Sequence, residues 1–66
     1  MNRIDEVLTE QGRTKKWLAE KLNRSQNTVT NWTSQKSQPS LEDIIKISKL
    51  LSVDVNDLIK DTNKGE

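Results

Sequence analysis

The residues whose chemistry stands out lie between positions 26 and 33, a segment rich in amide and hydroxyl side chains. Gln26, Asn27 and Asn31 carry carboxamides, Thr28 and Thr30 carry hydroxyls, and the segment holds no charged residue. A carboxamide can form paired hydrogen bonds with adenine N6 and N7, and threonine can bond to any base or place its methyl group against thymine. The pattern predicts a helix that reads bases, chiefly through these three carboxamides.

A helix that only faces solvent would also be polar. Such a surface more usually carries Glu, Lys and Arg, because these residues favour helices more than Asn and Thr do. The amide-rich composition therefore favours base reading over simple solvation.

Positive charge surrounds this segment. The whole chain has a formal net charge of +1, whereas the cations between residues 13 and 36 face only one carboxylate, Glu20. The cations are Arg13, Lys15, Lys16, Lys21, Arg24 and Lys36. A basic middle in a nearly neutral chain suits a face that meets phosphates, although a solvated run of charges has the same composition.

Lys15 and Lys16 fall in the first turn of an expected helix, where the helix dipole disfavours cations and favours a bound anion. Further polar residues flank or belong to the segment 26–33, where they could grip the DNA backbone on both sides. A simple contribution to solubility is the alternative. The residues expected to contact phosphates are Lys15, Lys16, Arg24, Thr28, Thr30, Ser34, Gln35 and Lys36.

Apolar spacing and capping residues predict five short helices, at about residues 2–11, 15–22, 26–33, 41–51 and 55–60. Gly12 and Asn23 can take the left-handed conformation that ends a helix. The expected N-caps are Thr14, Ser25, Ser40 and Asp54. Ser40 with Asp43 also resembles a capping box, and residues 34–39 are expected to form a loop that ends in proline. Residues 61–66 form a polar tail.

A chain of 66 residues allows one domain, and the absence of Phe and Tyr leaves Leu, Ile, Val and two Trp to build its core. We expect a compact all-α domain over residues 1–60, with Trp32 buried beside Val29. Trp17 is expected to be half-buried, covering the first helix, stacking near a DNA backbone or contacting a protein partner.

Several classes of function are disfavoured. The chain has neither Cys nor His, so thiolate and imidazole ligands for a metal are absent. No cluster of side chains indicates catalysis, so we expect neither an enzyme nor a cofactor or metal site. The sequence also lacks an apolar run of membrane-spanning length and a signal peptide, which makes a cytoplasmic location the expectation.

Two stretches carry a family resemblance. Residues 15–22 (KKWLAEKL) followed by 24–32 (RSQNTVTNW) resemble the lambda-repressor-like, Cro-type helix-turn-helix family, which includes the xenobiotic-response-element type. Residues 39–51 and 53–59 are similar to the fourth and fifth helices of that family, so the resemblance covers about residues 3–60. The combination of the Leu-Ala pair, the serine cap, the Pro-Ser pair and the last short helix makes it specific.

The resemblance implies a helix-turn-helix unit at about residues 14–33, with Ser25, Gln26, Asn27 and Asn31 facing bases. It also implies that Lys15 and the loop 34–36 meet phosphates. Two positions depart from the family: Asn23 stands where Gly is frequent, and residues 33–35 replace a common Glu-x-Gly.

We therefore expect a sequence-specific transcriptional regulator, more specifically a repressor, that places helix 26–33 in the major groove of double-stranded DNA. Two copies would bind a two-fold symmetric operator as a weak homodimer, joined through helix five and the end of helix four. The alternative is a protein-interaction module of the same fold, such as an antitoxin or adaptor.

Overall fold

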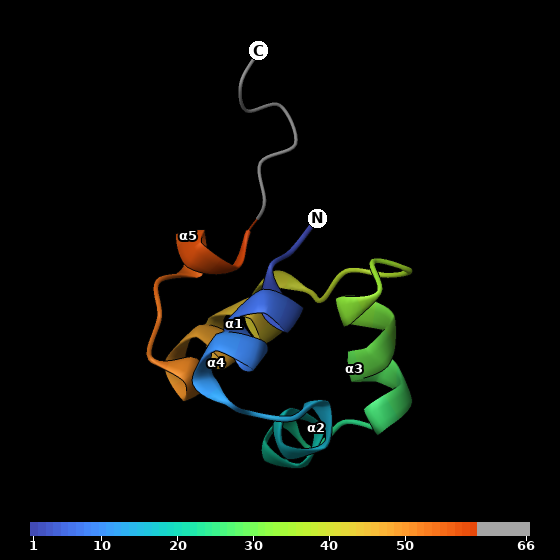
Figure 1. Cartoon of the computed structure of the whole chain (residues 1–66). Helices are drawn as coiled ribbons and strands as arrows, with labels where there is room; N and C mark the ends of the chain where they lie inside the picture. The colour runs from blue at the N-terminus through green and yellow to red at the C-terminus, as the bar shows by residue number, and fades with distance from the viewer. Residues whose placement is uncertain (60–66) are drawn as a thin grey trace.

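The computed structural model describes residues 1–59, which form helices packed around one apolar core (Figure 1). The expected all-α architecture is confirmed, and the described part holds no β-strand beyond one antiparallel bridge between Asn2 and Ile59. No helix in this part has the length and apolar character needed to cross a bilayer. The helices are α1 (Ile4–Gln11), α2 (Lys15–Leu22), α3 (Gln26–Thr33), α4 (Leu41–Leu51) and α5 (Val55–Leu58).

Local signals set most of the helix ends. The hydroxyls of Thr14, Ser25 and Ser40 each accept a hydrogen bond from the backbone N–H three residues later, which confirms them as N-caps. Gly12 and Asn23 end α1 and α2 in the left-handed conformation, as expected. Thr14 and Asn23 mark the two ends of α2, and Ser25 marks the start of α3. Because these signals are local, the predicted bounds of α2 and α3 match the structure.

Two predicted helix ends were wrong. The first helix begins at Ile4 instead of residue 2, because Asn2 lies in the bridge to Ile59 and Arg3 N–H donates to the Leu58 carbonyl at 2.8 Å. The last helix ends at Leu58, since Ile59 is extended to form its side of the bridge. Lys60 and the predicted tail 61–66 lie outside the described residues.

The core is built from the side chains that the helical periodicity selects. Ile4, Leu8, Leu18, Ile47 and Leu58 are fully buried or nearly so. In Figure 1, α1 is seen in front of α4 in the middle of the view, α2 closes one end, and α3 stands at the side away from α5. The core therefore supports α3 from one side only.

An ion pair connects the turn between α2 and α3 to the start of α4. Arg24 Nη2 donates to both carboxylate oxygens of Asp43, at 3.0 and 3.1 Å. The Asp43 carboxylate also accepts the Ser40 hydroxyl at 3.2 Å, so the Ser40 half of the expected capping box forms while Asp43 turns toward Arg24. Asp43 is only 5% exposed. The pair thus fixes the helix-turn-helix unit to the rest of the domain.

Replacing Asp43 by Asn tests this connection. We expect D43N to lower the free energy of unfolding by about 1–2 kcal/mol, because a charge-assisted bond is lost while Arg24 keeps access to water. Urea unfolding followed by tryptophan fluorescence measures the change. Glu42→Gln is the matched control, since it removes an exposed carboxylate from the same helical turn. Equal losses in the two variants would contradict a specific role for the Arg24 pair.

Candidate nucleic-acid interface

Helix α3 is anchored by a narrow apolar edge. Val29 is fully buried and Trp32 is 4% exposed, which confirms the expected burial of Trp32. The other side chains of α3 are exposed or half-buried. A short helix held along one edge in this way presents most of its side chains to solvent.

The carboxamides predicted to read bases are unpaired. Gln26 and Asn27 are exposed and Asn31 is half-buried, and none of the three amide groups has a hydrogen-bond partner within residues 1–59. By contrast, the carboxamides of Asn2, Gln11, Gln35 and Gln38 are all bonded inside the domain. The α3 amides are therefore free to form hydrogen bonds with a ligand.

The start of α3 is held by its own hydroxyls. Ser25 Oγ accepts the Thr28 backbone N–H at 3.1 Å and lies 2.9 Å from Thr28 Oγ1. Ser25 is exposed, whereas Thr28 is half-buried. Ser25 could meet a base only while continuing to cap the helix, and Thr28 faces Ser25. Thr30 is exposed and carries a free hydroxyl among the described residues.

Two lysines lie at the N-terminal end of α2. Lys15 is half-buried and Lys16 is exposed, neither has an ion-pair partner in the described part, and the first turn of α2 contains no carboxylate. Their charges add to the positive end of the helix dipole instead of offsetting it. This end of α2 is thus an electropositive position on a helix that packs against α3.

Trp17, in the same turn, is half-buried as expected and packs against the core. The Arg13 guanidinium lies over its ring, 4.4 Å from the centroid, in cation–π geometry. The ring therefore covers the core and supports a cation next to Lys15 and Lys16.

Four of the predicted phosphate ligands have side-chain partners inside the domain: Thr28, described above, and Arg24, Gln35 and Ser34. Arg24 pairs with Asp43, although its side chain remains 47% exposed. The Gln35 carboxamide bonds to the backbone of Asn2, so a contact with phosphate would have to replace these bonds. Ser34 is exposed, with its hydroxyl donating to the Asn31 carbonyl at 3.3 Å, and Lys36 is exposed and unpaired among the described residues.

Sequence reasoning missed the role of Asn2. This residue is 5% exposed and its side chain bonds to three groups, the Ile4 N–H, the Trp32 carbonyl and the Gln38 carboxamide. A local signal existed, because an Asn side chain can accept a hydrogen bond from the backbone N–H two residues later. Its contacts to residues more than thirty positions away had no such signal.

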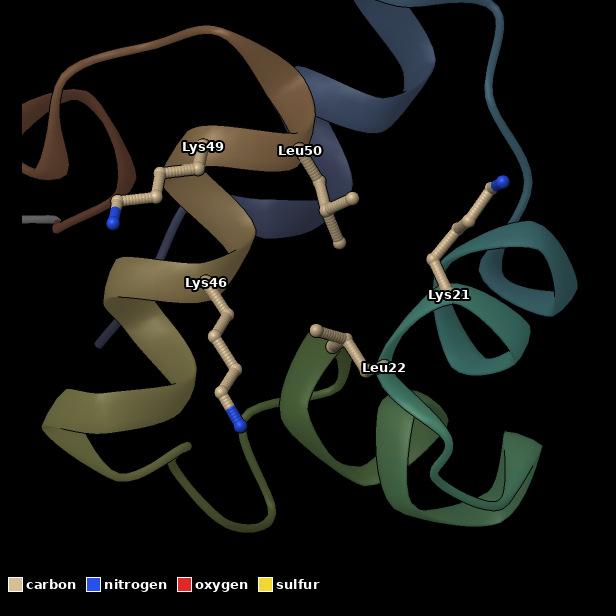
Figure 2. A pocket seen from close by; sticks show the side chains of 5 residues that line it. All are labelled: Lys21, Leu22, Lys46, Lys49 and Leu50. Atoms are coloured by element: carbon tan, nitrogen blue, oxygen red, sulfur yellow. The ribbon is translucent and has the colours of Figure 1, made fainter.

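A shallow groove lies apart from the exposed face of α3, between α2 and α4. It has a volume of about 390 Å³ and is lined by Lys21, Leu22, Lys46, Lys49 and Leu50. Figure 2 shows Leu22 and Leu50 pointing toward each other across it, while the ammonium groups of the lysines extend outward. Within the described residues, no group of three or more carboxylates could hold a metal ion.

Comparisons with known proteins agree with this geometry. A helix-turn-helix family model matches residues 4–58. The crystal structure of a candidate DNA-binding protein from Bacteroides fragilis is similar to the chain, with 50% sequence identity and a TM-score of 0.90. The alignment covers 91% of this chain and 97% of that one. A search of curated protein sequences finds no match.

The family match spans all of the described helices, and the structural match extends over nearly all of both chains. Both matches include the α2–turn–α3 segment. The chain therefore belongs to the Cro/C1-type helix-turn-helix family.

Proposed function

We propose that this protein is a sequence-specific DNA-binding transcriptional regulator, acting as a repressor, that reads the major groove with α3. The observation that carries the proposal is the set of carboxamides of Gln26, Asn27 and Asn31, which are unpaired within residues 1–59 and lie on a helix whose buried side chains are those of Val29 and Trp32. In helix-turn-helix proteins the second helix lies in the major groove and its N-terminal residues reach the base edges. Gln26 and Asn27 begin α3 and Asn31 lies one turn beyond Asn27, which suits that approach.

The likeness to a candidate DNA-binding protein from Bacteroides fragilis supports the same function. At 50% identity and 0.90 TM-score, the backbone that presents α3 is shared between the two proteins. Asn and Gln bind adenine in a bidentate manner, so the operator is expected to contain A·T pairs opposite α3.

Phosphate contacts would fix the register of the protein on the duplex. Lys15 and Lys16 would bind on one side of α3, and Ser34 and Lys36 on the other. Arg24 would contribute through the guanidinium nitrogens that Asp43 leaves free. Thr30 would add a contact, and Thr28 a weaker one because its hydroxyl faces Ser25. Gln35, also predicted to meet phosphate, is bonded to Asn2 and would contribute only by giving up these bonds. Such contacts supply affinity without reading sequence.

Dimer formation would let two copies of α3 occupy successive major grooves about 34 Å apart on a two-fold symmetric operator. The exposed large apolar side chains include Leu41 and Ile45 on α4 and Ile59 just after α5. Leu41 and Ile45 are four residues apart and therefore share one face of α4. We expect the weak homodimer to use this face of α4 together with the end of α5. This face lies near the start of α4, whereas the sequence pattern indicated the end of that helix.

A protein-interaction module of the same fold is the second candidate. The groove between α2 and α4 favours it, because two leucines are surrounded by lysines that have no ion-pair partner in residues 1–59. Titration with mixed-sequence DNA at low and high salt separates the two candidates. A DNA-binding protein must lose affinity steeply as salt rises.

The carboxamide prediction is tested on DNA selected from a random pool. We expect Gln26→Ala or Asn31→Ala to cost about 1–3 kcal/mol at the selected site and little on random DNA, because only base contacts are lost. Fluorescence anisotropy with both duplexes measures this difference. Asn56→Ala is the matched control, since it removes an exposed carboxamide from α5. Equal losses on both duplexes would remove Gln26 from base reading.

The phosphate prediction uses Lys15→Ala. We expect weaker binding to selected and random DNA alike. The negative slope of log K against log salt should become shallower by about 0.9 for the lost contact. Lys46→Ala, at an exposed cation of α4, serves as control. If the two lysine variants bind alike, Lys15 does not contact the DNA backbone.

A further inference from the structure

The loop that follows α3 takes an unusual path. Gln35 adopts a left-handed conformation with φ of 68°, which is uncommon for a residue other than glycine. The loop then turns back on α3, because the N–H groups of Lys36 and Ser37 both donate to the Asn31 carbonyl, at 2.9 and 3.2 Å. This turn sets the direction in which the exposed Lys36 leaves the end of α3.

The N-terminal segment holds this turn through paired amides. Asn2 N–H donates to Gln35 Oε1 at 3.2 Å, and Gln35 Nε2 donates to the Asn2 carbonyl at 3.0 Å. The side-chain amide of Gln35 therefore pairs with the backbone of Asn2 as a neighbouring strand would. The two bonds offset the conformational cost of the left-handed backbone at Gln35.

The side chain of Asn2 binds both ends of the same loop. Asn2 Nδ2 donates to the Trp32 carbonyl at 3.0 Å and to Gln38 Oε1 at 2.9 Å, while Gln38 Nε2 donates to Gln35 Oε1 at 3.1 Å. Three carboxamides, from Asn2, Gln35 and Gln38, thus form one connected network, which we call the amide clamp. Each of them is bonded at both its nitrogen and its oxygen, through the clamp, the backbone or both.

The clamp rests on a fixed support. Asn2 Oδ1 accepts the Ile4 N–H at 3.1 Å, and Arg3 N–H donates to the Leu58 carbonyl at 2.8 Å. Arg3 also pairs with Glu6 at 2.6 Å, and the hydrogen bond to Glu6 raises the pKa of the Arg3 guanidinium further above its already high ordinary value. In Figure 1 the N-terminal segment passes between α5 and the loop after α3. The loop is therefore braced against α1 and α5 as well as against α3.

We propose that Asn2 is a positioning residue for DNA binding: through the amide clamp it holds the loop 34–38 in the shape in which Ser34 and Lys36 face the DNA backbone. This inference rests on the proposed function. Residues 33–35 replace the Glu-x-Gly that is common in the family after this helix. In this chain the shape of the loop would instead be held by Asn2, which is far from α3 in sequence. Gln35 acts within the clamp rather than as a free phosphate ligand.

The test measures DNA affinity as a function of salt for Asn2→Ala, Lys36→Ala and the double variant, using the unmodified chain as reference. The slope of log K against log salt is negative. We expect each single variant to reduce the magnitude of this slope by about 0.9, the value for one phosphate contact. We expect the double variant to fall little further, because Lys36 contributes only while the clamp holds it. A double-mutant cycle isolates this coupling from separate losses.

Gln11→Ala is the matched structural control. Gln11 Nε2 donates to the Leu51 carbonyl at 2.8 Å, so this variant also removes a carboxamide bond between the N-terminal helix and a distant backbone group, but one that does not touch the loop. We expect Gln11→Ala to lower stability without changing the salt slope. Amide hydrogen exchange should rise at Lys36 and Ser37 in Asn2→Ala, and should not rise selectively there in Gln11→Ala.

Gln35→Gly covers the case in which Asn2→Ala does not fold. Glycine tolerates the left-handed backbone, so this variant removes the clamp with less strain on the fold. It should reproduce the shallower salt slope and the faster exchange of Lys36 and Ser37. A full additional loss from Lys36→Ala in a variant lacking the clamp, or an unchanged slope in both clamp variants, would overturn the proposal. Absence of DNA binding by the unmodified chain would instead refute the proposed function from which it follows.

Discussion

The packing of Val29 and Trp32 into the core is the contact on which the rest of this structure depends. These are the buried side chains of α3, and they hold a helix whose other residues remain exposed or half-buried. A wider apolar edge would have buried the amides that are left free, while a narrower one would not have fixed the helix. Burying a large apolar side chain contributes about 1.5–3 kcal/mol, which is less for two side chains than the cost of ordering an eight-residue helix at about 1–2 kcal/mol per residue. The domain therefore adds polar connections at both ends of α3.

Those connections have different origins. At the N-terminal end of α3, the Ser25 cap is local and the Arg24–Asp43 pair joins the preceding turn to α4. At the C-terminal end, the Trp32 carbonyl accepts hydrogen bonds from Gln35 N–H and from Asn2 Nδ2. The chain thus uses its carboxamides in two ways: those of Asn2, Gln35 and Gln38 fix the end of α3, while those on α3 itself stay open to a partner. Asn2 is 5% exposed, and a buried amide is costly unless it is bonded, which explains why its carboxamide is bonded at both the nitrogen and the oxygen.

The same distinction explains what the sequence could predict. The bounds of α2 and α3, the left-handed ends at Gly12 and Asn23 and the burial of Trp32 follow from residues close together in sequence, and the structure confirms them. The bridge between Asn2 and Ile59, the Arg24–Asp43 pair and the turn of Gln35 toward Asn2 depend on residues brought together only by the fold. Periodicity carries no information on these contacts, so the outer ends of the first and last helices were misplaced. The exposure of Asn27 could be anticipated because it lies off the Val29–Trp32 edge, and that of Gln26 because it is the first residue of the helix and is polar.

On binding DNA, the free carboxamides of α3 are expected to exchange water for bases. Nuclear magnetic resonance tests this expectation most directly, by following the side-chain NH2 signals of Gln26, Asn27 and Asn31 as a selected duplex is added. We expect these signals to shift strongly and their exchange with water to slow, while the NH2 group of Asn56 on α5 stays unchanged. Unshifted α3 amides in a saturated complex, with the perturbations centred instead on Leu22 and Leu50, would contradict it.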